Sequence, residues 1–400
     1  MMRTIHTHDQ FLRSATAATI AMGVIGAMGL AACAPSQNAD QSNSAGAGSQ
    51  VNVVATTTQI CDYVTQIATD NAEGATLALD KTAADGTRTT AGAAADQAET
   101  TLALTCLLAP NASAHEHEMT PAQTKALANA DILFVNGIDL EHFLDDAIES
   151  SGFKGTMTVT TGVLSSADID DLAAQKDKEK GLPYKVSRGS QAVDVAEWPF
   201  PPEDGEEAEF RFDPHVWTSP KNAAIQVANI GEALSAAAPD NAELFNTRVK
   251  AYQDQLTALD QWTADSLASI SDEHRVLFTS HDAFGYFSAS YGITFIGAAL
   301  SDFSEQQDAT AEHIRQAAQT VKESGATALF AENSNNSKSI EAIAKAAGVK
   351  AVIGDDALYG DSLGPAGSQG ETYTGSIIHN VTTLVTAWDG TLAPLPDVIK

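Results

Sequence analysis

Short apolar runs alternate with amphipathic segments along most of the chain, and this alternation predicts the fold class. The first apolar run covers 51–56 and is followed, over 59–69, by apolar residues at helical spacing. The same order of strand and helix repeats between 120 and 161 and again between 276 and 388. Because parallel strands need a crossover between them, usually a helix, the pattern predicts an α/β fold with mostly parallel sheets.

One amphipathic segment is much longer than the rest. Over 241–271, apolar residues recur in steps of four and three from Phe245 to Leu259. A helix of this length extends about 45 Å, which is longer than a crossover within one sheet requires. We therefore expect a rigid helix that joins two α/β lobes, an N-terminal lobe at 51–240 and a C-terminal lobe at 272–400.

Two stretches of the N-terminal lobe lack this pattern. Segment 71–101 consists largely of Ala, Thr, Gly and Asp and has few large apolar residues, so we expect a surface insertion outside the core. Segment 165–211 is polar and contains a run of acidic residues and prolines between Asp194 and Glu209. This composition predicts a mobile acidic loop.

The amino-terminal sequence predicts export. Arg3 and Arg13 precede an uncharged apolar run, Ala17–Ala32, which is shorter than the ~20 residues of a membrane-spanning helix. Small residues then lead into Cys33, an arrangement that resembles a bacterial lipobox. We expect 1–32 to be a signal peptide, Cys33 to carry lipid and 33–50 to be a flexible tether, which would place the protein outside the cytoplasm and anchored to the membrane. The alternative is a soluble secreted protein cut at the alanines.

Charge and the remaining cysteines narrow the classes of function. The chain has 22 Lys and Arg against 52 Asp and Glu, a formal net charge of −30, which argues against nucleic acid as a partner. Cys61 and Cys106 would lie in an oxidising compartment, so a disulfide between them is expected. A thiolate metal pair is the alternative, but no softer ligands accompany the two cysteines in the adjacent sequence.

Candidate metal ligands lie at the junctions between loops and regular elements. His115 and His215 each precede a Thr-Pro or Ser-Pro helix start, and His281 follows the apolar strand predicted at 276–279. Open α/β sheets bind ligands at the carboxyl ends of their strands. A fourth candidate is Asp361, which comes soon after another predicted strand. Three imidazoles and a carboxylate suit zinc, and also manganese, cobalt or iron(II), if the fold gathers them.

Several segments, in this order, resemble the metal-binding lipoproteins of zinc and manganese ABC importers, the cluster A-I or ZnuA/TroA-like family. The resemblance spans about 51–385. Its motifs are His115 with Glu118-Met119-Thr120-Pro121, Asn136-Gly137, Asp213-Pro214-His215-Val216-Trp217, Ser280-His281-Asp282-Ala283-Phe284-Gly285, Asp361-Ser362-Leu363-Gly364 and His379-Asn380-Val381.

The resemblance implies a function and a ligand set. The implied ligands are His115 and His215 from the first lobe and His281 and Asp361 from the second, with Zn²⁺ or Mn²⁺ held in the cleft between the lobes. The protein would be a monomeric binding protein rather than an enzyme. It would deliver the metal to the permease and ATPase subunits of an ABC transporter.

Departures from the family pattern leave the metal open. Ser113-Ala114 stand where an Asp-Pro usually precedes the first histidine, so His117 is a rival to His115. The acidic run replaces the histidine-rich loop of zinc importers, whereas His281 stands where the manganese branch often has glutamate. The absence of the histidine-rich loop argues against zinc, and the histidine at position 281 argues for zinc.

Two other classes of function are compatible with part of the sequence. A zinc hydrolase would keep three protein ligands and an activated water, so direct coordination by Asp361 would argue against it. An adhesive surface lipoprotein would explain the anchor but none of the four candidate ligands. Within the metal-binding reading, Glu332 is a candidate to support an imidazole, and affinity is expected to fall below pH ~6.5, where free histidine becomes protonated.

Overall fold

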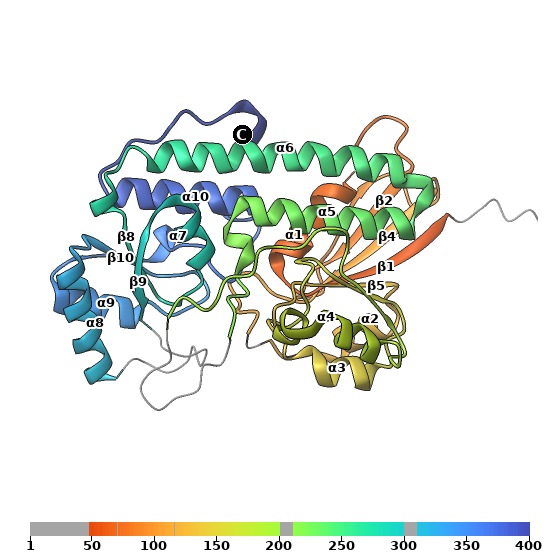
Figure 1. The fold of residues 1–400 in the computed structure, drawn as a ribbon. Coiled ribbons are helices and arrows are strands. Elements are labelled where there is room, and N and C mark those ends of the chain that lie inside the picture. Colours follow the sequence, from red (N-terminus) through yellow and green to blue (C-terminus); the bar gives the residue numbers. More distant parts are fainter. Residues whose placement is uncertain (1–47, 70, 116, 201–210, 300–309) are drawn as a thin grey trace, which may run out of the picture. The chain divides into compact units, whose positions relative to one another are not determined.

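In the computed structural model, the described part of the chain forms two separate β-sheets (Figure 1). The structure describes residues 48–69, 71–115, 117–200, 211–299 and 310–400. The expected signal peptide, the lipidated Cys33 and all but the end of the expected tether lie outside these residues. No helix among the described residues has both the length and the apolar character needed to cross a membrane.

The N-terminal sheet has seven strands in the order β3-β2-β4-β1-β5-β6-β7. All neighbouring pairs are parallel except β2 and β3, which are antiparallel. The strands are β1 (Ser49–Ala55), β2 (Leu77–Thr82), β3 (Arg88–Gly92), β4 (Thr100–Cys106), β5 (Ile132–Val135), β6 (Thr156–Val159) and β7 (Lys185–Ser187). The helices of this lobe are α1 (Thr58–Ala68), α2 (Pro121–Ala128), α3 (Leu144–Ser151), α4 (Ser166–Glu179) and α5 (Pro220–Ala237).

The expected surface insertion at 71–101 is instead part of this sheet. Strand β2 lies between β3 and β4, and the side chains of Leu77 and Leu79 are buried. The expectation of a segment outside the core was wrong for these residues. Pairing with β4 and packing against α1 supply the burial that a composition poor in large apolar residues does not indicate.

The expected loop at 165–211 also contains regular structure. Residues 166–179 form α4 and residues 185–187 form β7, which pairs with β6. The guanidinium of Arg188 bonds the carboxylates of both Asp168 and Glu179, and so ties α4 to the residue after β7. This charge network lets a polar sequence order itself without many apolar side chains. Much of the acidic run, 201–210, lies outside the described residues.

The C-terminal sheet has four parallel strands in the order β11-β10-β8-β9. The strands are β8 (Val276–Thr279), β9 (Thr294–Ala298), β10 (Ala328–Phe330) and β11 (Lys350–Val352). The helices are α7 (Gly285–Tyr291), α8 (Ala311–Ser324), α9 (Lys338–Ala347) and α10 (Tyr373–Ala387). Short 3-10 turns among the described residues are η1 (Val216–Thr218), η2 (Pro239–Asn241), η3 (Asp272–His274), η4 (Gly354–Asp356) and η5 (Asp397–Ile399).

The predicted long helix is α6 (Ala242–Leu267), with 26 residues and a length of about 39 Å at 1.5 Å per residue (Figure 1). It packs against α1 and α5 of the N-terminal lobe and against α10 of the C-terminal lobe. Its buried stripe includes Phe245, Tyr252 and Trp262, and these join one apolar cluster with residues of both sheets. The two sheets therefore belong to one compact unit, Gly46–Lys400, in which α6 is a shared support.

Candidate metal centre

The four predicted ligands lie together. His115, His215, His281 and Asp361 each offer one ligand atom, and these atoms all lie within 4.8 Å of one another. His115 lies in the loop between β4 and α2, and His215 immediately precedes η1. His281 follows the end of β8, and Asp361 lies between η4 and α10. The fold thus brings two side chains from each lobe to one point.

The spacing of the donor atoms suits a single small cation. His115 Nε2 lies 3.0 Å from His215 Nε2, and Asp361 Oδ1 lies 3.4 Å from His215 Nε2 and 3.5 Å from His281 Nδ1. Asp361 Oδ2 lies 4.0 Å from His115 Nε2. Donors in a tetrahedral site with bonds of 2.0–2.2 Å are about 3.3–3.6 Å apart, so small shifts would complete such a site.

Asp213 orients the His215 ring. Its Oδ1 accepts hydrogen bonds from His215 Nδ1 at 2.7 Å and from the His215 backbone N–H at 2.9 Å. A proton fixed on Nδ1 leaves Nε2 to face the other three ligand atoms. The bond to the backbone N–H is one that a turn residue commonly makes. The bond to the ring was missed, although a carboxylate two residues before a histidine was its visible signal.

Glu332, the candidate to support an imidazole, hydrogen-bonds the backbone of His281. Its Oε1 accepts the His281 backbone N–H at 2.9 Å, and its Oε2 lies 3.9 Å from His281 Nδ1. The Glu332 backbone N–H in turn bonds the hydroxyl of Ser280 at 3.2 Å. Glu332 also packs so closely against Gly360 that any side chain at position 360 would collide with the carboxylate. Glu332 therefore fixes both the His281 backbone and the start of the Asp361 loop.

Residues of the N-terminal lobe hold the loop that carries Asp361. The hydroxyl of Ser113 donates to Asp361 Oδ2 at 2.8 Å, and the amide of Gln59 donates to the Asp361 carbonyl at 3.1 Å. The backbone N–H of Leu363 donates to the Thr58 hydroxyl at 2.8 Å. Sequence reasoning missed these three partners, because their contacts join residues roughly 250–300 positions apart in the chain. The carboxylate therefore depends on both lobes for its position.

The four side chains shift one another's pKa values. Burial lowers the pKa of His115 well below its usual value. Burial also lowers the pKa of His215, but hydrogen bonds to Asp213 and Asp361 outweigh it and raise the pKa to about 9. Burial disfavours charge on His281 as well, yet Asp361 and Glu332 hold its pKa well above the usual value. Burial raises the pKa of Asp361, but the surrounding imidazoles more than reverse this and lower it.

These shifts favour one distribution of charge at the site. Their directions favour a proton on His215, a neutral His115 and an ionised Asp361, and His215 Nε2 lies 3.0 Å from His115 Nε2. Positive charge on the imidazoles thus compensates the buried carboxylate. A bound cation would take over this role and release protons.

His117 lies outside the cluster. Its ring packs edge-on against Phe143, with ring centroids 4.9 Å apart. Of the two histidines that the sequence offered for the first position, the structure places His115 among the other three candidate ligands. The choice of His115 over His117 therefore has geometric support.

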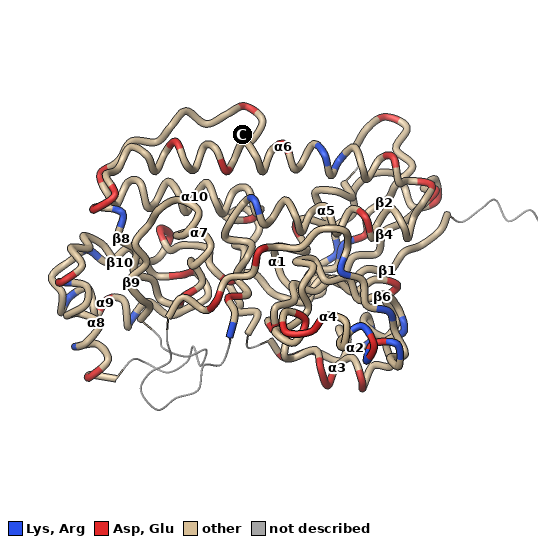
Figure 2. The backbone as a smooth tube through the Cα atoms, in the orientation of Figure 1, with Lys and Arg blue, Asp and Glu red and all other residues tan. Residues whose placement is uncertain are grey.

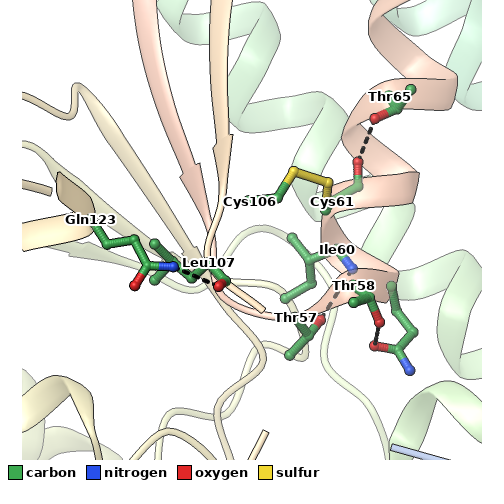
Figure 3. Close-up of a disulfide and its surroundings, with 9 residues drawn as sticks. Thr57, Thr58, Ile60, Cys61, Thr65, Cys106, Leu107 and Gln123 are labelled. Carbon is green, nitrogen blue, oxygen red and sulfur yellow. Dashed lines mark hydrogen bonds between the residues drawn. A yellow bond between two sulfur atoms is a disulfide. The ribbon is translucent and has the colours of Figure 1, made fainter. Parts of the chain in front are cut away.

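The expected disulfide between Cys61 and Cys106 is present (Figure 3). It joins the first turn of α1 to the last residue of β4, with the two Cα atoms 5.6 Å apart. The alternative of a thiolate metal pair is therefore wrong for this structure. The bond links two parts of the site, since the residues just before Cys61 hold the Asp361 loop and the chain after Cys106 leads to His115.

Comparison with known proteins shows the family to which the chain belongs. Residues 89–387 match the family model described as zinc-uptake complex component A, periplasmic. The chain is 31% identical over 284 residues to the zinc-binding protein TroA of Treponema pallidum, covering 70% of this chain and 80% of the relative. It is 29% identical over 287 residues to the manganese-binding lipoprotein MntA of Bacillus subtilis, covering 71% and 82%. The solved structure of the T. pallidum periplasmic zinc-binding protein superimposes with a TM-score of 0.57 at 26% identity, covering 85% of this chain and 99% of that one. The chain belongs to the zinc-uptake component A family of metal ABC transporter substrate-binding proteins.

Proposed function

We propose that this protein binds a divalent transition metal outside the cytoplasm and delivers it to the permease of an ABC importer. The metal would be cargo, held by His115, His215, His281 and Asp361. The observation that carries the proposal is the convergence of these four side chains, two from each lobe, within 4.8 Å. Relatives named as zinc-binding and manganese-binding proteins support the same reading.

The site suits capture better than catalysis. A catalytic zinc site keeps three protein ligands and leaves one position for an activated water. Here four protein donors lie close enough to fill a tetrahedral sphere, and Asp361 is one of them. We therefore infer transport rather than hydrolysis. Adhesion would give none of these four residues a role.

Zinc and manganese are both candidates for the cargo. Three imidazole nitrogens with one carboxylate favour Zn²⁺ at equilibrium, because Mn²⁺ lies lowest in the affinity order of divalent first-row metals. Supply also decides which ion is carried. We infer that the isolated protein binds Zn²⁺ more tightly than Mn²⁺, and that either ion can be cargo where it is abundant.

The proposed role in metal import also implies a lipid anchor and transporter partners. We infer that Cys33 carries the lipid, that the tether lets a monomer reach its permease, and that an ATPase subunit drives import. Asp and Glu residues occur on helices of both lobes (Figure 2), and the net charge of the chain is −30. A negative surface attracts cations and raises their local concentration, an effect that weakens with added salt.

Metal analysis tests the proposal. Protein purified without chelators should contain one zinc or manganese ion per chain, and dialysed protein should take up one equivalent of Zn²⁺. Competition between Zn²⁺ and Mn²⁺ should favour Zn²⁺. Absence of stoichiometric uptake of either ion by folded protein would refute the proposed function.

A further inference from the structure

The turn between β5 and α3 contains a run of unusual backbone conformation. Gly137, Ile138 and Asp139 have φ angles of 92°, 55° and 57°. A left-handed conformation is strained for a β-branched residue such as Ile138, and strain of this kind persists only where surrounding contacts impose it. The contacts that hold this turn therefore indicate what the turn is for.

Glu141 supplies the contacts at the start of this turn, while the backbone N–H groups of Ile138 and Asp139 donate to the carbonyls of Val163 and Leu164. Its Oε1 accepts hydrogen bonds from the Asn136 backbone N–H at 2.6 Å and from the Thr56 hydroxyl at 2.8 Å. Its Oε2 accepts the Gly137 backbone N–H at 3.1 Å. Burial raises the pKa of Glu141 to about 7, against the opposing effect of these bonds. A carboxylate is costly to bury, so its place here indicates a role beyond packing.

Asn136 extends this network to the metal centre. Its side-chain amide donates to the carbonyl of Pro214 at 3.0 Å, and its Oδ1 accepts from Gln226 at 2.9 Å. The side chain is buried and held at both ends. Pro214 directly precedes His215, so the backbone that Glu141 fixes at Asn136 also sets where the His215 loop lies.

The same turn contacts the other ligand loop of the N-terminal lobe. Phe143 lies two residues after Glu141 and packs edge-on against His117, with centroids 4.9 Å apart. His117 belongs to the loop that carries His115. The turn from Asn136 to Phe143 thus reaches both ligand loops of this lobe, although it supplies no ligand itself.

We propose that Glu141 is a positioning residue for the metal centre, which holds the start of the left-handed turn and acts through Asn136 and Pro214 on His215. This inference rests on the proposed function, because it assumes that His215 is a ligand. Glu141 is not one of the four candidate ligands, so its effect should appear as altered site geometry rather than as a missing donor.

The test compares Glu141→Ala, Asn136→Ala and the double variant with the unchanged protein. Zn²⁺ affinity is measured by competition with a chromophoric chelator, and ligand geometry by the visible absorption of protein loaded with Co²⁺. We expect each single variant to bind Zn²⁺ about tenfold more weakly and to change the Co²⁺ spectrum. The double variant should lose no more than either single variant, because both residues act along one path.

The stability of each variant is measured as a control. Melting temperatures are measured with and without Zn²⁺, and the proposal concerns the difference between them, which a merely structural role would not reduce. Glu149→Gln, on the exposed face of α3, is the matched control and should behave as the unchanged protein. If Glu141→Ala does not fold, Glu141→Gln replaces it, alone and in the double variant, with the same expected loss of Zn²⁺ affinity.

Two results would overturn the proposal. One is unchanged Zn²⁺ affinity and Co²⁺ spectrum in folded variants at Glu141 and Asn136. The other is a double variant whose loss equals the product of the two single losses, which would mean that the residues act independently. Failure of the unchanged protein to bind Zn²⁺ would instead refute the proposed function, and this role with it.

Discussion

Asp213 Oδ1 lies 2.7 Å from His215 Nδ1 and also accepts the backbone N–H of the same histidine. This pairing fixes the proton on Nδ1 and leaves Nε2 for a metal. The two residues therefore act as a unit, in which the carboxylate sets the tautomer and the imidazole supplies the ligand.

Asp213→Asn should weaken metal binding without unfolding the protein. The amide can donate to Nδ1, which would place the ring proton on Nε2 and block its lone pair. Zn²⁺ affinity should fall by about 10–100-fold, as measured by competition with a chelator. Asp240→Asn, at an exposed position in η2, serves as the control. An Asp213→Asn variant with unchanged affinity would show that Asp213 is only a turn residue.

Metal affinity should rise with pH up to about pH 9. His215 has a pKa raised to about 9 in the metal-free protein, so at pH 7 its Nε2 carries a proton that the metal must displace. Each pH unit below 9 should weaken Zn²⁺ binding by about tenfold for each imidazole that must lose a proton. Affinity should therefore begin to fall at a higher pH than the ~6.5 expected from the pKa of free histidine. Titration calorimetry between pH 5.5 and pH 9, in buffers of differing ionisation enthalpy, measures both affinity and proton release. Flat affinity between pH 7 and pH 9 would contradict the account.

The raised pKa of His215 also makes the stability of the protein without metal depend on pH. A histidine whose pKa is raised on folding stabilises the native state fully below its unfolded pKa of about 6.5, and this contribution is lost as the pH rises through about 9. Removing the metal should therefore cost the most stability at the alkaline end of this range.

The disulfide should stabilise the fold and protect the site. Closing a loop of 45 residues stabilises by ~4 kcal/mol in the chain-entropy model, so Cys61→Ser with Cys106→Ser should lower the free energy of unfolding by about that amount. Urea unfolding measures the change. Metal affinity should also fall, because Gln59, two residues before Cys61, holds the Asp361 carbonyl. One or two reactive thiols in denatured, non-reduced protein would disprove the bond.

His117→Ala should bind Zn²⁺ nearly as well as the unchanged protein, whereas His115→Ala should lose at least about tenfold, because it removes a nitrogen ligand. The reason is geometric, since His117 packs on Phe143 and His115 Nε2 faces His215 Nε2. The two variants, measured in parallel by chelator competition, control for each other. Equal losses would mean that the ligand in this loop is wrongly assigned.

Much of the fold could be predicted from periodicity. The spacing from Phe245 to Leu259 predicted α6, and the apolar run before His281 predicted β8. Periodicity failed at Leu77 and Leu79, whose burial depends on a neighbouring strand. A strand with few large side chains shows its place in a sheet only through tertiary contacts.

The candidate site, too, could be predicted from the sequence only in part. Histidines beside strand ends and helix starts could be recognised from local sequence, and motif resemblance supplied the combination with Asp361. Several of the residues that hold those ligands could not be recognised. Glu141 acts through a strained turn, and Ser113 reaches Asp361 across 248 positions of sequence. Neither relationship leaves a local pattern, because the first depends on contacts within the folded N-terminal lobe and the second on how the two lobes meet.

The central claim is that one metal ion is bound by both lobes through four side chains. A crystal structure of the Zn²⁺-loaded protein, with the ion identified by anomalous scattering, tests it most directly. The account predicts one ion at about 2.0–2.2 Å from His115 Nε2, His215 Nε2, a nitrogen of His281 and a carboxylate oxygen of Asp361. An ion bound wholly within one lobe, or one reached by Asp361 only through a water, would contradict it.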